Sequence, residues 1–357
     1  MGRKSLIKSL CPETKIDDNI RGHQPPAPDM HVSRSQAEAT RLLPLAERAL
    51  TRYPFKHREI EHLVTHSNVM YRVVSENGNQ MVLRVGTPHA NYRSNIEIEV
   101  SWLDAIRRET GLDVVQPIAT SEGKLIVDEF DNTIEKERAC VLFSWVPGRQ
   151  MGDGSGPFAY RLLGSMCASL QQHGRTFMPP TPERMRLWDE VFYYRQDFDP
   201  VIIQNPAYGH LFDRSRTTTI RKAMELAQGV LDDSYATARP QVVHGDLHEW
   251  NVHVASSRLY ALDFEDVMWA LPAQDASICL YSSRKSEMVT DIRAAFRKGF
   301  ESVAPWPIVD ERQLDGFHAS RQIMLMNYAG RTLPVDEAAD YLNDVMPWLE
   351  RYVQRYG

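Results

Sequence analysis

The sequence predicts an α+β protein with two lobes, a small β-rich N-terminal lobe and a larger, mostly helical C-terminal lobe. Strand-like runs separated by turn residues dominate residues 33–146. Helical periodicity dominates residues 147–357, where two short strand-like runs interrupt it. A strongly polar motif lies on one of these short runs, so we expect the chemistry of the protein there.

The composition is that of an ordinary globular protein. The chain has 357 residues, of which 43% are apolar and 25% charged, and this is enough to build two sizeable cores. A net charge of −6 argues against a nucleic-acid partner. No apolar run is long enough to cross a bilayer, and the four cysteines are scattered without a CxxC pair. We therefore expect a cytoplasmic monomer or homodimer with no membrane partner.

The N-terminal lobe is expected to follow a flexible extension. Residues 1–32 contain the run GHQPPAPD and show little apolar periodicity. The next run, residues 35–50, has the apolar spacing of an amphipathic helix. We expect this helix to be kinked at Pro44 or to start there, because proline cannot donate a backbone hydrogen bond.

A β-hairpin is predicted next. Residues 70–75 and 80–85 are rich in strand-forming side chains and flank Asn77-Gly78, the strongest short-range hairpin signal. The spacing over residues 94–109 then predicts a helix. The remaining strand-like runs of this lobe are residues 124–130 and 139–146.

The C-terminal lobe is predicted from its helical runs. Apolar spacing typical of helices recurs in residues 160–173, 216–233, 320–331 and 337–353. The two short strand-like runs between these helices are residues 241–246 and 259–266.

The motif VVHGDLHEWNVHV, residues 242–254, has the spacing of a phosphoryl-transfer loop. Four residues separate Asp246 from Asn251, as in the catalytic loop of kinases, where the Asp accepts a hydroxyl proton and the Asn binds magnesium. Twelve residues after Asn251 comes Asp263, in LDFE, where a protein kinase has DFG. Magnesium prefers such oxygen ligands, and a further carboxylate can deprotonate the attacking hydroxyl.

Two other functions fit parts of this motif. Zinc could bind His244, His248 and His253 on spacing alone, but a strand and loop offer these histidines no common face, and no HExxH arrangement is present. A serine hydrolase would need a GxSxG elbow, which the sequence lacks. The two acidic motifs and the β-rich lobe upstream together favour a kinase.

The N-terminal lobe offers an independent test of this interpretation. Kinases place a cation on the third strand and pair it with a carboxylate on the following helix. Here the strand MVLRV carries Arg84, and the helix contains Glu97 and Glu99. Helical spacing puts Glu99 on the apolar face, where a charge needs a partner, and Glu97 on a polar face. We therefore predict that Arg84 pairs with Glu99, although a partly exposed Glu99 remains the alternative.

With these residues identified, the chain resembles the aminoglycoside phosphotransferase and choline kinase-like family of small-molecule kinases. Its closest likeness is to bacterial stress-response Ser/Thr kinases and homoserine kinase-like members. HGDLHEWN, residues 244–251, fits the family pattern HGDxHxxN. LDFED, residues 262–266, fits a second acidic segment, and Asp275 follows where the family has another Asp. The resemblance covers roughly residues 40–330 and implies a bilobal protein kinase-like fold.

The resemblance also implies ATP and Mg²⁺ as cofactors, bound in the cleft between a nucleotide-binding N-terminal lobe and a catalytic and substrate C-terminal lobe. Asp246 would be the catalytic base, with Asn251 and Asp263 as magnesium ligands. The nucleotide would contact the phosphate-covering turn, the cation with its partner, and the backbone of the hinge: Ser67, Asn68, Arg84, Glu99, Phe143, Ser144, Trp145 and Val146. Ser67 departs from the glutamate common in relatives, and Arg84 from the usual lysine.

The acceptor is predicted to be a hydroxyl of a small molecule, such as an aminoglycoside, an amino alcohol or a homoserine-like compound. A protein Ser/Thr kinase and a nucleotide-binding pseudokinase are the alternatives. An acidic stripe over residues 336–344 could hold a polycationic acceptor, but a solvated helix face explains it as well. The same choice, between a box for an ammonium group and lobe core, applies to the aromatic cluster Trp188, Phe192, Tyr193 and Tyr194.

Overall fold

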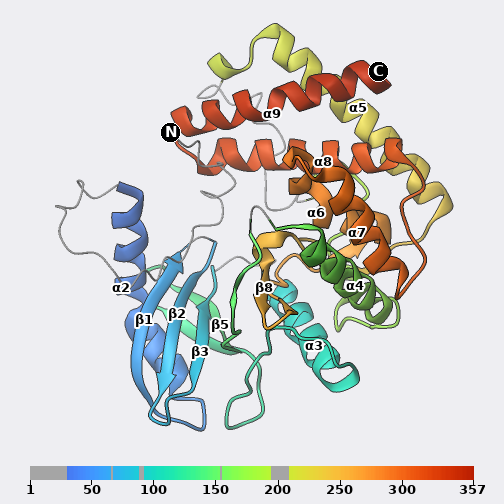
Figure 1. Ribbon diagram of the computed structural model, residues 1–357. Coiled ribbons are helices and arrows are strands. Elements are labelled where there is room, and N and C mark those ends of the chain that lie inside the picture. The colour runs from blue at the N-terminus through green and yellow to red at the C-terminus, as the bar shows by residue number, and fades with distance from the viewer. Residues whose placement is uncertain (1–29, 66, 88–91, 153–154, 194–208) are drawn as a thin grey trace, which may run out of the picture. The chain divides into compact units, whose positions relative to one another are not determined.

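A computed structural model describes residues 30–65, 67–87, 92–152, 155–193 and 209–357 of the chain (Figure 1). The chain divides into two compact units. The first unit runs to Gly148 and includes Pro179–Arg184, and the second unit consists of Arg149–Met178 and Met185–Gly357. The first unit carries an antiparallel sheet and the second is mostly helical, so the predicted α+β class is confirmed.

The first unit is built on a five-stranded antiparallel sheet with the strand order β1-β2-β3-β5-β4. The strands are β1 (His57–Thr65), β2 (Val69–Ser75), β3 (Gln80–Val85), β4 (Val127–Asp131) and β5 (Lys136–Ser144). The predicted hairpin is confirmed as β2 and β3, with Val74 opposite Gln80. Gly78 has a φ of +83°, a conformation that is unfavourable for residues with a side chain, so this turn favours glycine. Because β3 lies between β2 and β5, Arg84 stands in the centre of the sheet.

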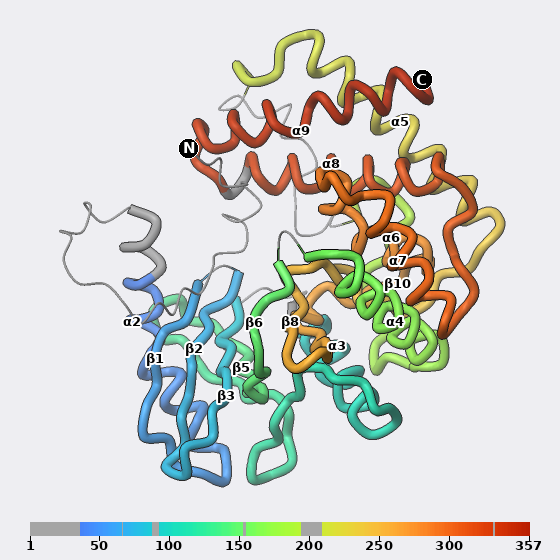
Figure 2. Tube along the Cα trace, in the orientation of Figure 1, coloured from blue at the N-terminus to red at the C-terminus, as the bar shows by residue number. Residues whose placement is uncertain are grey.

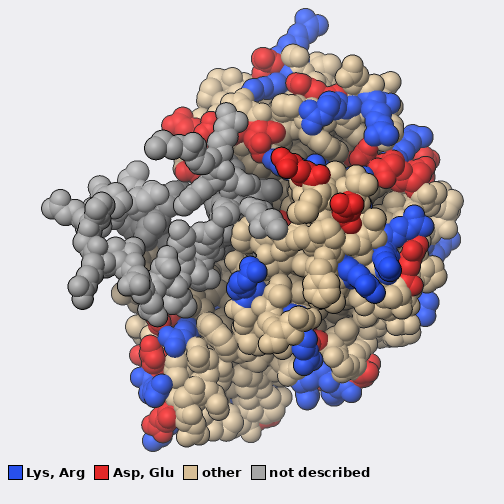
Figure 3. All heavy atoms as spheres, in the orientation of Figure 1, with Lys and Arg blue, Asp and Glu red and all other residues tan. Residues whose placement is uncertain are grey.

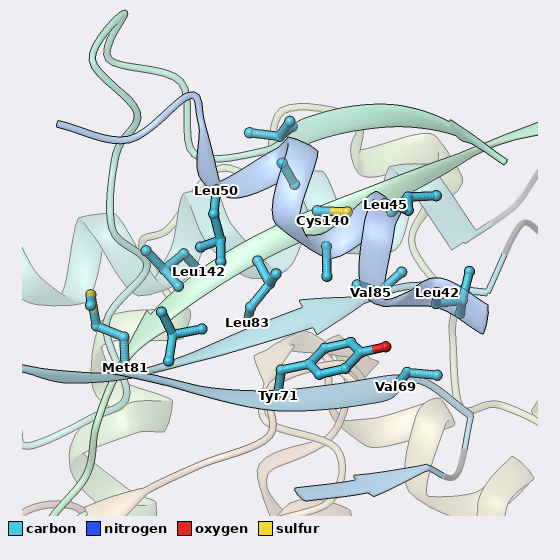
Figure 4. Close-up of a cluster of buried hydrophobic side chains, with 14 of the residues drawn as sticks. Leu42, Leu45, Leu50, Val69, Tyr71, Met81, Leu83, Val85, Cys140 and Leu142 are labelled. Carbon is cyan, nitrogen blue, oxygen red and sulfur yellow. The ribbon is translucent and has the colours of Figure 1, made fainter. Parts of the chain in front are cut away.

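Helix α2 (Met30–Leu50) packs on one face of this sheet. Leu42, Leu45 and Leu50 meet side chains of the strands in an apolar cluster (Figure 4). The predicted helix is thus present, but it begins at Met30 and not at Pro44. Pro44 lies on the exposed side inside the helix, where losing one backbone hydrogen bond is offset by the burial of the opposite side. Residues 1–29 of the predicted extension lie outside the described residues.

Helix α3 (Tyr92–Glu109) follows β3 and confirms the predicted amphipathic helix. Ile96, Trp102, Leu103 and Ile106 are buried, and Glu99 is buried among them. Glu97 lies on the exposed face, where it pairs with Arg93 at 3.0 Å. The helical spacing therefore separates the two glutamates as predicted.

The second unit contains six α-helices in the described residues and two small sheets (Figure 2). The helices are α4 (Pro157–Gly174), α5 (Arg214–Thr237), α6 (Pro272–Tyr281), α7 (Val289–Glu301), α8 (Glu311–Thr332) and α9 (Val335–Tyr356). The sheets contain β6 (Arg149–Gln150), β7 (Gln241–Val243), β8 (Val252–Ala255), β9 (Arg258–Ala261) and β10 (Met268–Ala270). None of the helices in the described ranges has the length and apolar character that crossing a bilayer requires.

The two small sheets hold the motif identified in the sequence. Strand β7 pairs with β10, and β8 lies between β6 and β9. The loop that carries Asp246 therefore follows β7, whereas Asn251 and Asp263 stand at the same end of the β8–β9 hairpin, because Val252 lies opposite Ala261. On the face shown in Figure 3, acidic and basic side chains intermingle over the described surface, as expected from the modest net charge.

Candidate active site

Asp246 is held from three directions. Arg321 Nη2 of α8 lies 2.6 Å from its Oδ1, and Asn251 Nδ2 lies 3.0 Å from its Oδ2. His248 Nε2 approaches the same Oδ2 to 3.3 Å. The Asp246 side chain nevertheless remains 21% exposed. The carboxylate is thus fixed in orientation but still open to an incoming group.

These neighbours keep Asp246 ionised. Burial by itself would raise the pKa of Asp246, but its interactions with His248 and Arg321, which include hydrogen bonds from both, outweigh it, so the pKa lies well below its ordinary value. Burial would also lower the pKa of Arg321, and the attraction of Asp246 reverses that shift. At neutral pH the two groups therefore form a partly exposed ion pair.

Gly245 allows the loop to make its turn. It has a φ of +80°, and a Cβ at this position would stand 2.1 Å from the carbonyl oxygen of Asp266. The Gly245 amide donates to Asp275 Oδ1 at 3.0 Å, from helix α6. Asp275 Oδ2 accepts from Gln171 Nε2 at 3.2 Å. Asp275 thereby fixes the backbone directly before Asp246, and burial raises the pKa of this carboxyl to about 6.

Asn251 directs its amide nitrogen at Asp246. Nδ2 donates to the backbone oxygen and to Oδ2 of Asp246, both at 3.0 Å. Since an amide nitrogen has two hydrogens, these two bonds use both of them and turn the amide oxygen elsewhere. That oxygen is the atom a magnesium ion would require.

Asp263 follows Leu262, whose backbone amide and carbonyl are both hydrogen-bonded. The Leu262 amide donates to Asn251 O, and Leu262 O accepts from His244 Nε2, each at 2.9 Å. Asp263 itself is exposed and has a φ of +56°, a left-handed conformation that is rare outside glycine. Such conformations are concentrated at functional sites, where the surroundings hold them in place.

Two histidines of the motif, His244 and His248, hold the loop in place through hydrogen bonds. His244 is buried, and burial lowers its pKa to about 4, so the ring is neutral and donates from Nε2. Its Nδ1 accepts from the Asp246 amide at 3.3 Å, and His248 Nδ1 accepts from the Trp250 amide at 3.2 Å. Both ring nitrogens of both residues thus already have partners in the protein. Across the described residues no three His, Cys, Asp or Glu side chains gather in a metal-binding group.

The ion pair predicted in the first unit is present. Arg84 Nη1 lies 3.0 Å from Glu99 Oε1, and Nη2 also contacts Oε2, so the two planar groups meet along two bonds. Both side chains are almost fully buried. The ring of Phe143 covers the guanidinium, 5.0 Å from its centroid. The exposed Glu99 considered as an alternative is therefore excluded.

The other predicted nucleotide contacts also belong to the first unit, in the turn before β2 and at the end of β5. Ser67 and Asn68 form the turn between β1 and β2, with Ser67 exposed and its carbonyl accepting from the Thr87 hydroxyl. The predicted hinge begins at the end of β5. There the Ser144 amide donates to Gln116 O at 2.8 Å, which commits this amide within the unit. Trp145 follows β5 and is partly exposed.

The aromatic cluster considered as an ammonium box belongs to the core. Trp188 is fully buried, its ring centroid lies 4.6 Å from that of Tyr193, and its Nε1 donates to Ser320 Oγ. Phe192 is half-buried, and Tyr194 lies outside the described residues. Lobe core is therefore the correct interpretation for Trp188 and Tyr193.

The acidic stripe is a solvated helix face. Asp336 and Asp340 are exposed on α9, and Asp344 pairs with Lys285. The opposite face of α9 buries Leu342, Val345, Met346 and Leu349. The stripe thus follows from the amphipathic character of the helix.

Sequence reasoning missed Arg321, which contacts Asp246 Oδ1 at 2.6 Å. Its helix was predicted, but nothing in the run SRQIMLMNYAGR relates it to a residue 75 positions away. Helical spacing was the available signal, because it places Arg321 on one face with Leu314, Phe317, Met324 and Leu325, where a charge needs a partner.

Comparisons with known proteins agree with this geometry. The family model described as the phosphotransferase enzyme family matches residues 60–311. An uncharacterized protein of Synechocystis sp. is 27% identical over 318 residues, which cover 87% of this chain and 85% of that protein.

Solved structures show the same fold at low sequence identity. A microcompartment-associated aminopropanol kinase has a TM-score of 0.72 at 22% identity, covering 88% of this chain and 97% of its own. An amicoumacin kinase solved with AMP-PNP and Ca²⁺ has a TM-score of 0.68 at 17% identity, covering 90% and 96%. A spectinomycin phosphotransferase with ADP and spectinomycin has a TM-score of 0.63 at 15% identity, covering 87% and 98%.

The chain therefore belongs to the phosphotransferase enzyme family. The predicted family, its kinase-like fold and the class of enzyme, a phosphotransferase, are confirmed.

Proposed function

We propose that this phosphotransferase moves the γ-phosphoryl group of ATP to a hydroxyl of a small molecule, with Mg²⁺ as cofactor. The observation that carries the proposal is the group Asp246, Asn251 and Asp263, fixed at neighbouring strand ends of the second unit. The nucleotides in the amicoumacin kinase and spectinomycin phosphotransferase structures support ATP as the donor.

The donor set fits a magnesium ion. Asn251 offers an amide oxygen because its nitrogen is committed to Asp246, and Asp263 offers an exposed carboxylate on a fixed backbone. Two protein oxygens suffice for magnesium, which keeps several waters in such sites. When bound, the ion would neutralise negative charge on the phosphate oxygens. Asn251 would in addition tie the metal side of the site to Asp246.

Asp246 would receive the proton of the acceptor. In the transfer, a bond forms between the hydroxyl oxygen and the γ-phosphorus, and the bond from that phosphorus to the β,γ-bridging oxygen breaks to release ADP. The hydroxyl proton passes to the Asp246 carboxylate, which is ionised and partly exposed. Its orientation is set by Arg321 and His248, so little reorganisation would be required when the acceptor binds.

The first unit would supply the nucleotide contacts. Arg84 would touch the ATP phosphates while Glu99 holds its guanidinium in place. Ser67 and Asn68 would cover the phosphates through their turn. At the hinge, from Phe143 to Val146, we favour Trp145 and Val146 as the backbone partners of adenine, because the Ser144 amide is already bound to Gln116.

A protein Ser/Thr acceptor is the second candidate, and a pseudokinase the third. The small molecule is favoured because the spectinomycin phosphotransferase and the aminopropanol kinase share this fold over most of the chain. An ionised Asp246 with both oxygen ligands nearby disfavours the pseudokinase. The cytoplasmic location, the absence of a nucleic-acid partner and the choice between monomer and homodimer stay predictions.

The test measures ADP release with ATP, Mg²⁺ and a panel of hydroxyl acceptors. Asp246→Asn should slow acceptor-dependent release by roughly 10²–10⁴-fold, the contribution typical of a general base. Thermal denaturation of both proteins controls for folding. Equal rates in the variant and the wild type would refute the assignment of Asp246, and casein phosphorylation without any small-molecule turnover would favour the protein kinase.

A further inference from the structure

Arg321 contacts one oxygen of the carboxylate that, under the proposed function, takes the proton of the acceptor. Its side chain is 9% exposed, and Nη2 contacts Asp246 Oδ1 at 2.6 Å. Asn251 and His248 both approach the other carboxylate oxygen, Oδ2. An acceptor hydroxyl that donates to Oδ1 would therefore share this oxygen with Arg321. Two donors on one oxygen stand roughly 4–5 Å apart, so the groups next to the hydroxyl lie close to the guanidinium.

A second guanidinium adds positive charge to this region. Arg284 lies over the ring of Tyr281 at 3.8 Å from its centroid, and Arg321 lies near the same ring at 5.5 Å. Arg284 donates to two uncharged acceptors, Tyr281 O at 2.8 Å and Gln322 Oε1 at 3.1 Å. Two cations therefore lie over one aromatic ring, and of the two only Arg321 pairs with the Asp246 carboxylate.

Each of these cations also has one buried nitrogen that donates no hydrogen bond. Arg321 Nε and Arg284 Nη1 have no hydrogen-bond partner among the described residues. A buried donor of this kind is costly unless a ligand or water satisfies it. Of the nearby carboxylates, Asp266 is paired with Arg186 at 3.1 Å, and Asp275 is bound by the uncharged Gly245 amide. Arg321 and Arg284 thus bring two positive charges next to each other, and only Asp246 forms an ion pair with either of them.

We propose that Arg321, supported by Arg284, determines acceptor specificity by favouring small hydroxy compounds that carry a carboxylate close to the reacting hydroxyl over polycationic ones. This inference rests on the proposed function and names the substrate class of the same site. Guanidinium groups bind carboxylates along two bonds, whereas they repel an ammonium group at the same place. Arg321 at the same time positions Asp246 through their ion pair.

The experiment compares acceptors that differ in the carboxylate alone. L-Serine is paired with ethanolamine and L-homoserine with 3-amino-1-propanol, and kanamycin serves as the polycation. Steady-state ADP release with Mg·ATP gives kcat and KM for the wild type. We expect kcat/KM at least tenfold higher for the better amino acid than for its decarboxylated partner, and lower still for kanamycin.

Three variants and one control variant separate acceptor selection from folding and from the positioning of Asp246. Arg321→Met should reduce the preference for the carboxylate to about unity, and Arg321→Lys should restore part of it. Arg284→Met does not touch Asp246, so it should raise KM for the amino acid more than it lowers kcat. Arg312→Met, on the exposed face of the same helix α8, is the matched control and should keep the wild-type preference. Thermal denaturation checks that each variant is folded.

Several results would overturn the inference. They are a wild-type enzyme that prefers the amino alcohols or kanamycin, one that accepts none of the five probes, and a preference that survives Arg321→Met. These failures are distinguishable from failure of the proposed function. If acceptor-independent ATP hydrolysis still depends on Asp246, phosphoryl transfer stands and the carboxylate preference alone is wrong.

Discussion

Asn251 gives both hydrogens of its side-chain amide to Asp246, at 3.0 Å from the backbone oxygen and 3.0 Å from Oδ2. The Asn251 side chain thereby fixes Asp246, the proposed base, and its own amide oxygen points away from Asp246. This relationship links the orientation of Asp246 to the proposed magnesium site, so a change at Asn251 should affect both.

Replacing Asn251 by Ala removes the amide oxygen. The Mg²⁺ concentration needed for half-maximal activity should rise by roughly 10–100-fold, as expected when a metal site loses a supporting group. Asn251→Asp keeps an oxygen but places a second carboxylate against Asp246, so it should retain metal activation better while kcat falls. ADP release measured against Mg²⁺ concentration distinguishes the two. A wild-type magnesium dependence in Asn251→Ala would remove Asn251 from the metal site.

Two glycines with similar backbone angles should differ in their tolerance of alanine. Gly78 has a φ of +83° and open space around it, whereas a Cβ on Gly245 would meet the Asp266 backbone. Gly78→Ala should therefore cost about 1–2 kcal/mol of unfolding free energy, the penalty of the left-handed conformation. Gly245→Ala should cost clearly more and abolish activity. Urea denaturation measures both, and equal costs would contradict the close packing at Gly245.

Removing only one charge of the Arg84–Glu99 pair should strongly lower the free energy of unfolding. Glu99→Ala leaves a buried guanidinium alone and should lower the unfolding free energy by about 3–5 kcal/mol. The double variant Arg84→Met, Glu99→Leu removes both charges and should recover much of that stability. It should still bind ATP weakly, because Arg84 is the proposed phosphate contact. Wild-type nucleotide affinity in a stable double variant would make the pair purely structural.

Asp275 should give the stability a pH dependence of unusual sign. Its pKa rises from 3.8 to about 6 on folding because it is buried, so the folded state holds its proton more tightly than the unfolded chain. Stability should therefore fall as pH rises from about 4 to 6, by about 3 kcal/mol in total. The wild type minus Asp275→Asn isolates this contribution from the other carboxyl groups. A difference in unfolding free energy that is constant from pH 4 to 7 would contradict it.

Local signals in the sequence predicted the first unit well. The hairpin around Asn77-Gly78 depends on a turn that only a few residue pairs allow, and the burial of Glu99 follows from helical spacing alone. Of the two alternatives predicted at Pro44, a helix start there was wrong, since packing against the sheet continues the helix through the proline.

Parts of the second unit had weaker signals. Helix α6 is buried on nearly every side and has no polar face to reveal its period, and β8 and β10 have only four and three residues. Helix α7 was overlooked although Ile292, Phe296 and Phe300 carry helical spacing. Arg321 could not be assigned to the site, because its relation to Asp246 exists only after α8 folds beside the motif.

The most direct test of the account separates the base from the metal ligand. AMP-PNP binding is titrated calorimetrically with and without Mg²⁺ for the wild type, Asp246→Asn and Asp263→Asn. Asn tolerates the left-handed backbone at 263, so the second variant changes the ligand and not the fold. We expect Asp246→Asn to bind Mg·AMP-PNP as tightly as the wild type, and Asp263→Asn to lose at least tenfold in the affinity that depends on magnesium. Wild-type binding by Asp263→Asn would contradict the account.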